Sequence, residues 1–484
     1  MIEIGDYEIE GKAFNRKLVP TDWRYAAAAV GMIRFFSQEK LPYKKQGRKL
    51  YYRYEDIYPE DELDQKFLLF VEDYLKDNMH HCQIEYKLKR LNDVTGEQRD
   101  ALLKEINDKL KANTILKKIF AGMECNGENG EIIQRRIEEH RLELIRQTFV
   151  NAKVGGYSQF SDANKLRSTS AATCRLSGFA VDGGRKTKAL GFCFDKDTFQ
   201  GKDEVEFDFV MFGFTKGAEA VFINDNISIE KLLNTNNALQ TFLSKKQGER
   251  ANWDAMFYNY METMPFLAYD VEVIKKAFHT GYFETIFLRE SRLHIFREIE
   301  EKWKNRDFSL DAALYRSVKV DQDSYINIMH EVTMAILNNQ NLDDLIEKLF
   351  FLNAGHGILR TLIEVNDIIY RMDRRLEEAM EEKVSLSGTF AAANAVVKYF
   401  ESAGNKNKIK NYRQKLSSVL VAKDYDRFIE IMLQLSSYTD ISFRFLHYLI
   451  QDFESNKNLA YNFVNQLVVS KDENKEEGGK KDEE

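Results

Sequence analysis

Two arginine–histidine pairs in this chain have a spacing that could support chemistry on RNA. Arg135 stands five residues before His140, and Arg289 stands five residues before His294. On a helix, the guanidinium of such a pair could stabilise a scissile phosphate while the imidazole transfers a proton. The 27 arginines and 8 histidines predict roughly 1.3 such pairs by chance over three spacings, so two pairs carry little weight.

Both pairs follow the R-x4-H pattern of HEPN ribonucleases, which cut RNA without a metal ion. Arg136 and Glu290 occupy the next position, where those enzymes commonly prefer Asn, Asp or His. The chain has no glycine-rich loop ending in Gly-Lys-Ser/Thr, and no His-Glu-x-x-His helix. His80-His81 is followed by Cys82 rather than Asp, so a histidine–aspartate nuclease centre is not indicated. These observations favour a binding protein over an enzyme.

The clearest candidate for nucleic-acid binding is a stretch of cations and tyrosines at residues 43–54. Cations can pair with phosphates, while tyrosine rings stack on bases or pack into the core. A solvated loop that leads into a helix is an equally good interpretation. The candidate contacts are Lys44, Lys45, Arg48, Lys49 and Arg53.

Two further candidates combine small and polar residues. At residues 153–165, glycines would let the backbone approach a groove closely, and polar side chains could read base edges. At 219–226, an apolar strand ends in Asn-Asp-Asn, which is typical of a strand-to-turn junction. A flexible glycine turn and an ordinary turn are the alternative interpretations. The candidate residues are Lys153, Gly155, Gly156, Tyr157, Gln159, Asn164 and Lys165 in the first segment, and Asn224 and Asn226 in the second.

The C-terminal part of the chain offers a fourth candidate. Cations outnumber acidic residues around 406–427, with Lys408, Lys410 and Arg413 as the candidate contacts. Such a face could track a displaced DNA strand, and an ordinary charged surface is an equally good interpretation.

The elements that must position these residues are mainly helices. Residues 23–36 predict a buried helix that follows Pro20-Thr21-Asp22, a boundary with capping candidates. Residues 63–75 and 93–120 predict amphipathic helices. Residues 204–210 alternate with period two, which predicts a half-buried antiparallel strand. We therefore expect a small β-rich part at about 154–226. Beyond residue 228 the pattern is almost wholly helical.

The predicted class is α+β with two domains and a tail. Residues 1–330 form a mainly helical domain with the inserted antiparallel β part, and 331–469 form a helical bundle. Residues 470–484 are charged and lack apolar side chains, which predicts disorder.

The composition sets limits on location and partners. The chain has 484 residues, 44% of them apolar, and a net charge of −7, so its nucleic-acid contacts must come from local patches or from a partner. Its sparse cysteines, Cys82, Cys125, Cys174 and Cys193, are typical of a reducing compartment. The longest apolar run, 26–33, is far shorter than a membrane span. We expect a soluble cytoplasmic protein.

Four short stretches carry a resemblance to a known family. They are the helix 22–36, the Phe222-Ile223-Asn224-Asp225-Asn226 segment, and the C-terminal stretches around 412–428 and 460–464. They are similar to the opening helix, the F-I-N-x-N signature and the C-terminal motifs of the large subunit of type I-B CRISPR Cascade, the CXXC-CXXC family.

The family's cysteine pairs imply a zinc knuckle, because two C-x-x-C pairs can close a tetrahedral site. Here Cys125 and Cys174 each lack the second cysteine, and Ser177 is a poor zinc ligand. Cys193 or His140 could substitute. We interpret the segment as a degenerate knuckle held by packing, and we expect no metal and no cofactor.

The resemblance implies a non-catalytic large subunit of a type I-B Cascade complex. Such a subunit recognises the motif beside the target, stabilises the R-loop and recruits the helicase-nuclease. The implied partners are CRISPR RNA, the Cascade backbone and small subunits, and double-stranded target DNA. By analogy with related systems, an internal start at Met329 or Met334 would yield a separate small subunit. A HEPN-like ribonuclease and a generic helical interaction scaffold are the alternatives.

Overall fold

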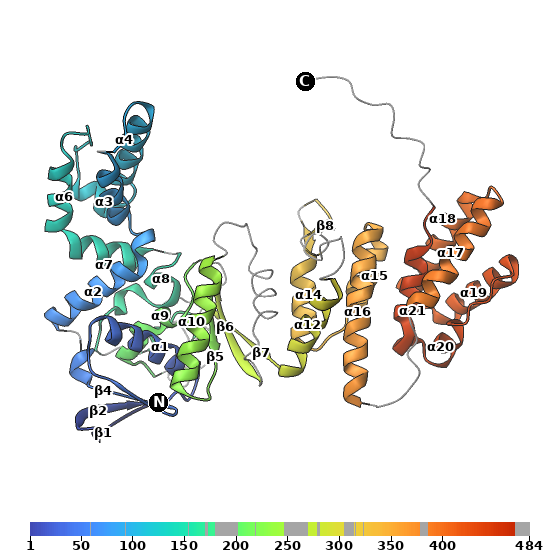
Figure 1. Ribbon diagram of the computed structural model, residues 1–484, viewed down its shortest axis with the longest axis horizontal. Coiled ribbons are helices and arrows are strands. Elements are labelled where there is room, and N and C mark those ends of the chain that lie inside the picture. Colours follow the sequence, from blue (N-terminus) through green and yellow to red (C-terminus); the bar gives the residue numbers. More distant parts are fainter. Residues whose placement is uncertain are drawn as a thin grey trace. The chain divides into compact units, whose positions relative to one another are not determined.

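The computed structural model divides the chain into two compact units (Figure 1). One contains Met1–Glu249 with Asp270–Leu288, and the other contains Arg250–Tyr269 with Arg289–Glu484. The predicted boundary at residue 330 lies inside the helix α14, Ile328–Leu337. The structure describes residues 1–58, 60–91, 93–152, 154–169, 173–179, 202–217, 219–245, 270–277, 281–303, 314, 316–322, 324–377 and 386–469. The predicted tail at 470–484 lies outside this set.

The first unit combines helices with two antiparallel sheets. Its strands are β1 (Ile2–Ile9), β2 (Lys12–Leu18), β3 (Lys44–Gln46), β4 (Lys49–Tyr52), β5 (Glu219–Asn224), β6 (Val271–Ala277) and β7 (Phe283–Leu288). Its helices are α1 (Trp23–Gln38), α2 (Asp61–Leu75), α3 (His80–Leu91), α4 (Glu97–Leu110), α5 (Thr114–Ile119), α6 (Gly130–Glu139), α7 (Arg141–Asn151), α8 (Tyr157–Phe160), α9 (Val210–Gly213) and α10 (Ile229–Lys245). The predicted α+β class is confirmed.

The central element of the first unit is α1, which the sequence predicts correctly. The Asp22 carboxylate accepts a hydrogen bond from the Arg24 backbone at 2.9 Å and so caps the first turn. Alanines 26–29 are fully buried. A Cβ atom at Gly31 would collide with the carbonyl of Phe209, and one at Gly213 would lie 2.5 Å from the carbonyl oxygen of Ala27. The small residues of α1 therefore let the 205–213 backbone approach closely.

The predicted strand at 204–210 is wrong. Val205–Phe209 form a 3₁₀ helix that continues into α9, and every residue from 205 to 213 is buried. The alternating acidic residues do not face solvent: Glu206 accepts a hydrogen bond from the hydroxyl of Tyr52 at 2.6 Å, and Asp208 pairs with Arg175. Because both faces of the segment are buried, a tight helical path against α1 replaces the half-exposed strand.

The first sheet, β1-β2-β4-β3, lies in a part of the chain that the sequence pattern assigned to helices. In β1 the apolar and charged residues alternate, and Glu10 and Gly11 both have positive φ in the turn to β2. A two-residue turn of this kind matches the twist of a hairpin. The alternation of apolar and charged residues in β1 is the feature of the sequence that could have predicted this sheet.

The second sheet, β5-β6-β7, confirms the predicted strand at 219–224 and corrects the region after residue 228. β6 and β7 are rich in β-branched and aromatic residues and pair antiparallel from Val271↔Leu288 to Lys276↔Phe283. A further hairpin, β8 (Ser317–Lys319) with β9 (Tyr325–Asn327), also replaces predicted helix. The predicted β-rich part at 154–226 includes residues outside the described set, and β5 takes its partner from beyond it.

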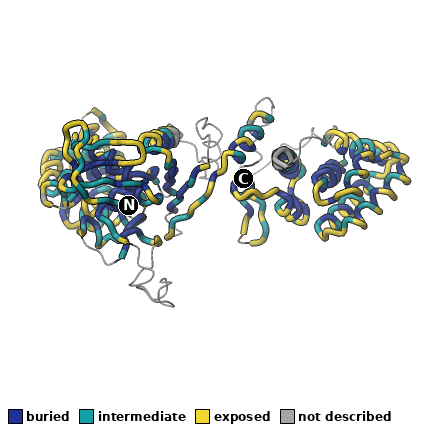
Figure 2. The backbone as a smooth tube through the Cα atoms, turned by 90° about the horizontal axis from the view of Figure 1, so that it is seen from below, coloured by how far each residue is buried: buried dark blue, intermediate teal, exposed yellow. Residues whose placement is uncertain are grey.

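The second unit is a set of packed helices. They are α12 (Glu290–Trp303), α14, α15 (Asp343–Phe351), α16 (His356–Glu377), α17 (Leu386–Ser402), α18 (Lys406–Val421), α19 (Tyr425–Thr439), α20 (Leu446–Gln451) and α21 (Phe453–Gln466). α21 packs against α16, α17 and α20, and all residues from Lys457 to Leu467 are buried. Figure 2 shows the buried residues on the inner sides of the helices. The predicted C-terminal helices agree with this arrangement.

Polar side chains of α21 make buried contacts with the neighbouring helices. Asn462 donates to the Thr389 hydroxyl at 2.6 Å, and Asn458 donates to the carbonyl of Ile363 at 3.1 Å. Lys457 lies 3.0 Å from Asp343, which also accepts from Tyr370 at 2.5 Å. Buried polar groups must be paired, so these contacts restrict the bundle to one register.

Candidate nucleic-acid interface

The cations of residues 43–54 lie on the β3–β4 hairpin and the turn that follows it. Lys44 pairs with Glu10, and Lys45 lies 3.7 Å from Glu230 at the start of α10. Arg53 makes two hydrogen bonds of 2.9 Å to Asp56. Acidic neighbours neutralise these three cations, so the cations are less available to bind phosphates.

The two cations at the tip of this hairpin differ from the other three. Arg48 is exposed and donates to the carbonyl of Pro20 at 3.2 Å. Lys49 is exposed, and within the described part of the chain no ion pair of its ammonium is found. Lys49 is therefore the cation of this segment with the greatest freedom to meet a phosphate.

The tip also lies beside the Asn-Asp-Asn turn. The backbone N–H of Ile229 donates to the carbonyl of Gly47 at 2.9 Å. The structure thus brings together two candidates that are far apart in the sequence.

Asn224 is buried and donates to Glu272 at 2.7 Å, while Asn226 is partly exposed. Asp225 is buried and accepts from the Thr235 hydroxyl at 3.0 Å, which fixes the turn. Only Asn226 has a side chain placed to meet a ligand.

The candidates at 153–165 are mostly internal. Tyr157 is 1% exposed, and its hydroxyl donates to Asp208 at 2.5 Å. Gln159 is buried, accepts from the Gly155 N–H at 2.7 Å and donates to the carbonyl of Lys276 at 3.2 Å. Both side chains are paired inside the core, and their role in reading base edges stays a prediction.

The glycines and the remaining polar residues of this segment have local roles. Gly155 has φ +69°, a left-handed conformation that suits glycine, and a Cβ atom at Gly156 would lie 2.5 Å from Ala152. Lys165 donates to the Thr173 hydroxyl at 2.6 Å, and Asn164 is exposed. Lys153 lies outside the described residues.

Sequence reasoning missed the ionic cluster that supports this region. The Arg175 guanidinium is fully buried and lies 2.6 Å from Asp208 and 2.9 Å from Asp203. Asp208 also accepts from the backbone N–H of Arg167 at 2.9 Å. Burial raises the pKa of Tyr157, and the charge of Asp208 raises it further. The feature of the sequence that could have revealed this cluster is Arg175, because an arginine in an otherwise apolar stretch predicts a buried partner.

The C-terminal candidates lie on α18, which carries Lys406, Lys408, Lys410, Arg413 and Lys415 and no acidic residue. Lys408 donates to the Tyr438 hydroxyl at 2.5 Å, and this hydrogen bond raises the pKa of Lys408. Lys410 is exposed. Arg413 is partly buried, and desolvation lowers its pKa. The structure places Lys408 among aromatic rings, which the sequence did not predict.

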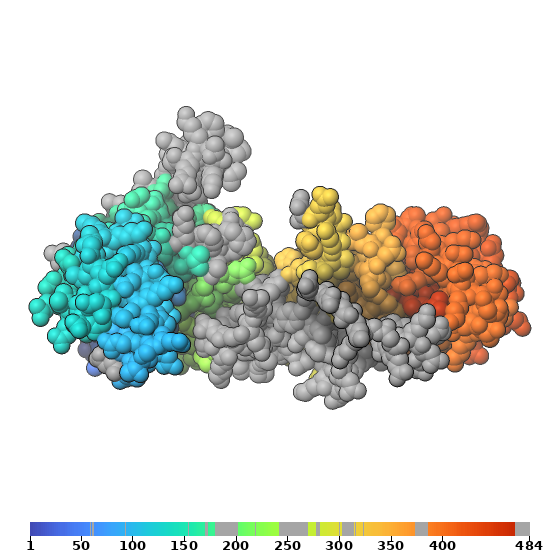
Figure 3. Space-filling view, turned by 90° about the horizontal axis from the view of Figure 1, so that it is seen from above, coloured from blue at the N-terminus to red at the C-terminus, as the bar shows by residue number. Residues whose placement is uncertain are grey.

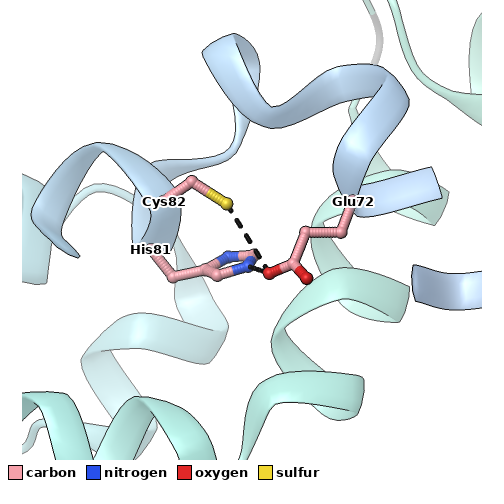
Figure 4. A group of neighbouring side chains, drawn as sticks. All are labelled: Glu72, His81 and Cys82. Carbon is pink, nitrogen blue, oxygen red and sulfur yellow. Dashed lines mark hydrogen bonds and ion pairs between the residues drawn. The ribbon is translucent and has the colours of Figure 1, made fainter. Parts of the chain in front are cut away.

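The one group of potential metal ligands found in the described residues comprises Glu72, His81 and Cys82 (Figure 4). His81 Nε2 lies 2.8 Å from Glu72 Oε1, and the Cys82 thiol donates to the same oxygen at 3.6 Å. Burial, followed by the charge of Glu72, raises the pKa of Cys82 to about 12, which disfavours the thiolate.

The positive charge of Arg141 has a strong effect on the electrostatics of this group. Its guanidinium donates to Glu72 Oε1 at 2.5 Å and also pairs with Glu85. Burial alone would raise the pKa of Glu72, but the hydrogen bond from His81 and the charge of Arg141 outweigh burial and lower it. A cation here would meet the positive charge of Arg141, so the arrangement favours a structural ion-pair cluster.

Cys125 and Cys174, the other two cysteines that the structure describes, belong to different hydrophobic cores. Cys125 belongs to the small hydrophobic core of α3–α7, and Cys174 belongs to the main core of the first unit. The backbone N–H of Cys125 donates to Asn107 at 2.7 Å, which fixes the loop that would correspond to one arm of a knuckle. Cys193 lies outside the described residues.

Neither arginine–histidine pair lies on one continuous helix. His140 separates α6 from α7 and lies 3.4 Å from Glu143, whereas Arg135 is an exposed residue of α6. Arg289 precedes the first residue of α12, and both Arg289 and His294 are exposed. In neither pair do the arginine and the histidine belong to the same helix.

The comparisons with known proteins give one family. The family of the CRISPR-associated protein Csx8 matches residues 14–254 and 246–467, and so covers both units. No curated protein and no solved structure matches the chain. In the described part of the chain, no helix combines the length and the hydropathy that crossing a membrane would demand. The chain belongs to the CRISPR-associated Csx8 family.

Proposed function

We propose that this chain is the non-catalytic large subunit of a type I-B CRISPR effector complex. It would recognise the motif beside the target, stabilise the R-loop and recruit the helicase-nuclease. The observation that carries the proposal is the family match over both units, together with the resemblance at the start, middle and end of the chain.

The distribution of charge supports a role in which the guide RNA and the protein recognise different parts of the target. In such a complex, base pairing with the guide RNA reads the sequence, and protein reads only a short duplex motif. A chain with a net charge of −7 suits this role, because a few local cations can suffice. The β3–β4 tip, with Lys49 exposed and Asn226 partly exposed beside it, is the surface of the first unit that we propose for the adjacent motif.

The first test is co-purification of the tagged protein with the products of its neighbouring genes, followed by sequencing of bound RNA. We expect uniform CRISPR RNA with backbone and small subunits. Recovery of the protein alone, without RNA, would refute the proposal.

The second test addresses the tip in the assembled complex. Lys49→Glu should weaken binding to target duplex by about tenfold, because it reverses the charge at an exposed phosphate contact. Lys66→Glu, which changes a partly exposed lysine paired with Glu62, is the control. Equal binding by the Lys49 variant and the wild type would remove the tip from the interface.

We also propose that an internal start yields a separate small subunit. Met329 and Met334 both lie in α14, so a product that starts at Met334 would begin inside that helix and retain α15–α21. Replacing both codons by leucine codons should abolish a short C-terminal band on an immunoblot. A persistent band would exclude these start sites.

A further inference from the structure

The sheet β5-β6-β7 is closed by side chains along its β5 edge. The backbone N–H of Thr215 donates to the carbonyl of Val221 at 2.9 Å, and the Val221 N–H donates to the Thr215 hydroxyl at 2.9 Å. The Asn236 side chain treats Ile223 in the same way: it accepts from the backbone N–H at 2.9 Å and donates to the carbonyl at 2.8 Å. These groups take the place of a further strand.

The opposite edge of this sheet is β7 (Figure 1). Hydrogen bonds in an antiparallel pair alternate in direction, and Val221 and Ile223 point away from β6. The register then directs the backbone groups of Glu284 and Ile286 toward β6. The groups left pointing outward belong to Phe283, Thr285 and Phe287. In the described part of the chain, no hydrogen bond to the outward groups of Thr285 or Phe287 is found.

The same three residues share one face of the strand, because side chains alternate along it. The Phe283 ring packs on Trp23 with 4.6 Å between centroids, whereas Thr285 is exposed and Phe287 is 68% exposed. The apolar face of β7 therefore continues beyond the core that covers its start. Figure 3 shows yellow-green atoms, the colour of β6 and β7, at the surface.

The edges of the other sheet of this unit carry features that discourage pairing with another strand. β1 has a bulge and the exposed acidic residues Asp6 and Glu8, and β3 has only three residues, two of them lysines. Bulges, charges and short length are how proteins protect sheet edges. β7 differs, because it has six residues in unbroken register with β6. Its one charged residue, Glu284, lies opposite Lys275 of β6.

The sequence of β7 is compatible with pairing to a second copy of itself. With a two-fold axis at Thr285, each threonine faces the other, and Phe287 faces Phe283 of the second copy. Glu284 faces Ile286 of the second copy, so no like charges are opposed. Aromatic and threonine pairs across antiparallel strands are stabilising. The exposed Phe287 ring would thus be covered by a ring that Trp23 already holds in place.

We propose that two copies of this chain associate through β7, which pairs antiparallel with β7 of the second copy and joins the two sheets into one. Two strands form a small interface, so the dimer is weak and depends on protein concentration. This inference is independent of the proposed function, because it concerns the purified chain alone.

The first test is analytical ultracentrifugation of the full-length protein. Because the interface is small, we expect twice the chain mass of 56.6 kDa at about 50 µM and the single mass at about 0.5 µM. A single mass at the higher concentration would overturn the proposal.

Charge variants at the two-fold axis test the geometry. Thr285→Lys places two lysines opposite each other, and Thr285→Glu places two glutamates, so each should weaken association by about tenfold or more. An equal mixture of the two variants should dimerise again, because opposite charges then face each other. A misfolded variant could not regain the dimer in this way. A mixture that stays monomeric while the wild type dimerises would place the interface elsewhere.

Ile4→Lys is the matched control, because it introduces the same charge at a residue that is 77% exposed on the edge strand β1. It should leave dimerisation unchanged. Thermal unfolding of the variants shows whether the fold is retained. A loss of association equal to that of Thr285→Lys would contradict the assignment to β7.

Hydrogen exchange locates the interface without a substitution. The outward N–H groups of Thr285 and Phe287 should exchange rapidly at low protein concentration and more slowly at high concentration, because pairing protects them. The peptide that contains Ile4 should exchange at the same rate in both cases. Protection that rises with concentration in the β1 peptide and not in the β7 peptide would overturn the proposal.

Discussion

At the residue scale, burial divides the polar side chains into structural and available groups. Tyr157 and Gln159 satisfy partners inside the fold, whereas Lys49 and Lys410 face solvent. The residue types alone do not distinguish these cases, because a tyrosine or an amide can serve either purpose. The polar groups with the greatest effect on stability are the buried ones, since an unpaired buried charge is costly.

Arg175→Met should destabilise the first unit strongly. The substitution leaves Asp203 and Asp208 buried without their shared cation, which costs about 3–5 kcal/mol in free energy of unfolding. Lys202→Met, which removes an exposed cation paired with Glu204, should have little effect. Urea denaturation measures both variants, and a loss for Arg175→Met no larger than that of the control would contradict the prediction.

Cys82 should react with iodoacetamide only at high pH. Its thiol is protonated below a pKa of about 12, so at pH 8 the thiolate fraction is about a thousandfold lower than for an ordinary thiol. The rate should rise about tenfold per pH unit from 8 to 11. Glu72→Gln should accelerate labelling, because the nearby negative charge is removed. Peptide mass spectrometry gives the rate, and a plateau below pH 9 would refute the assignment.

At the element scale, close backbone contact determines the fold of the first unit. The close approach to α1 occurs at Ala27 and Gly31, where the 205–213 segment passes as a 3₁₀ helix and α9. The sequence predicts α1 correctly because one helix can be read from its own periodicity and cap. It does not predict 205–213, because that conformation depends on an element far away in the chain.

Gly31→Ala should destabilise the protein by about 1–3 kcal/mol, because the added methyl group collides with the Phe209 carbonyl. Gly388 in α17 is the matched control: a Cβ atom there meets nothing within 4 Å. Gly388→Ala should stabilise by about 0.5–1 kcal/mol, since alanine favours the helix. Chemical denaturation tests both, and equal signs for the two variants would be inconsistent with this explanation.

At the scale of the whole molecule, each unit has its own interior. The first is built around α1, and the second is built around α21 with its buried pair Lys457–Asp343 at 3.0 Å. The family match extends over both units, so we assign the proposed function to the two units together.

We expect two separable unfolding transitions in calorimetry. Arg175→Met should lower the temperature of one transition, and Lys457→Met should lower the other, because each substitution removes the cation that pairs with a buried carboxylate in its own unit. The double variant should show both shifts together. A single transition that moves equally with either substitution would show that the units unfold cooperatively.

The sequence by itself determined the helices with strong periodicity, the strand that ends in Asn224, the α+β class and the resemblance to a CRISPR-associated family. These are properties of local patterns, which survive without knowledge of distant partners. β6 and β7 carried a local signal in their β-branched residues, but their pairing needed the fold.

Only the tertiary structure decided which polar groups are buried, paired or exposed. Tyr52 meets Glu206 across 154 positions, and Tyr399, Phe400, Lys408 and Tyr438 meet from three helices. Contacts of this kind depend on how elements pack, because burial and pairing are set by neighbours that no local pattern specifies. The candidate contacts were therefore predictable as residue types, while their availability to a ligand was not.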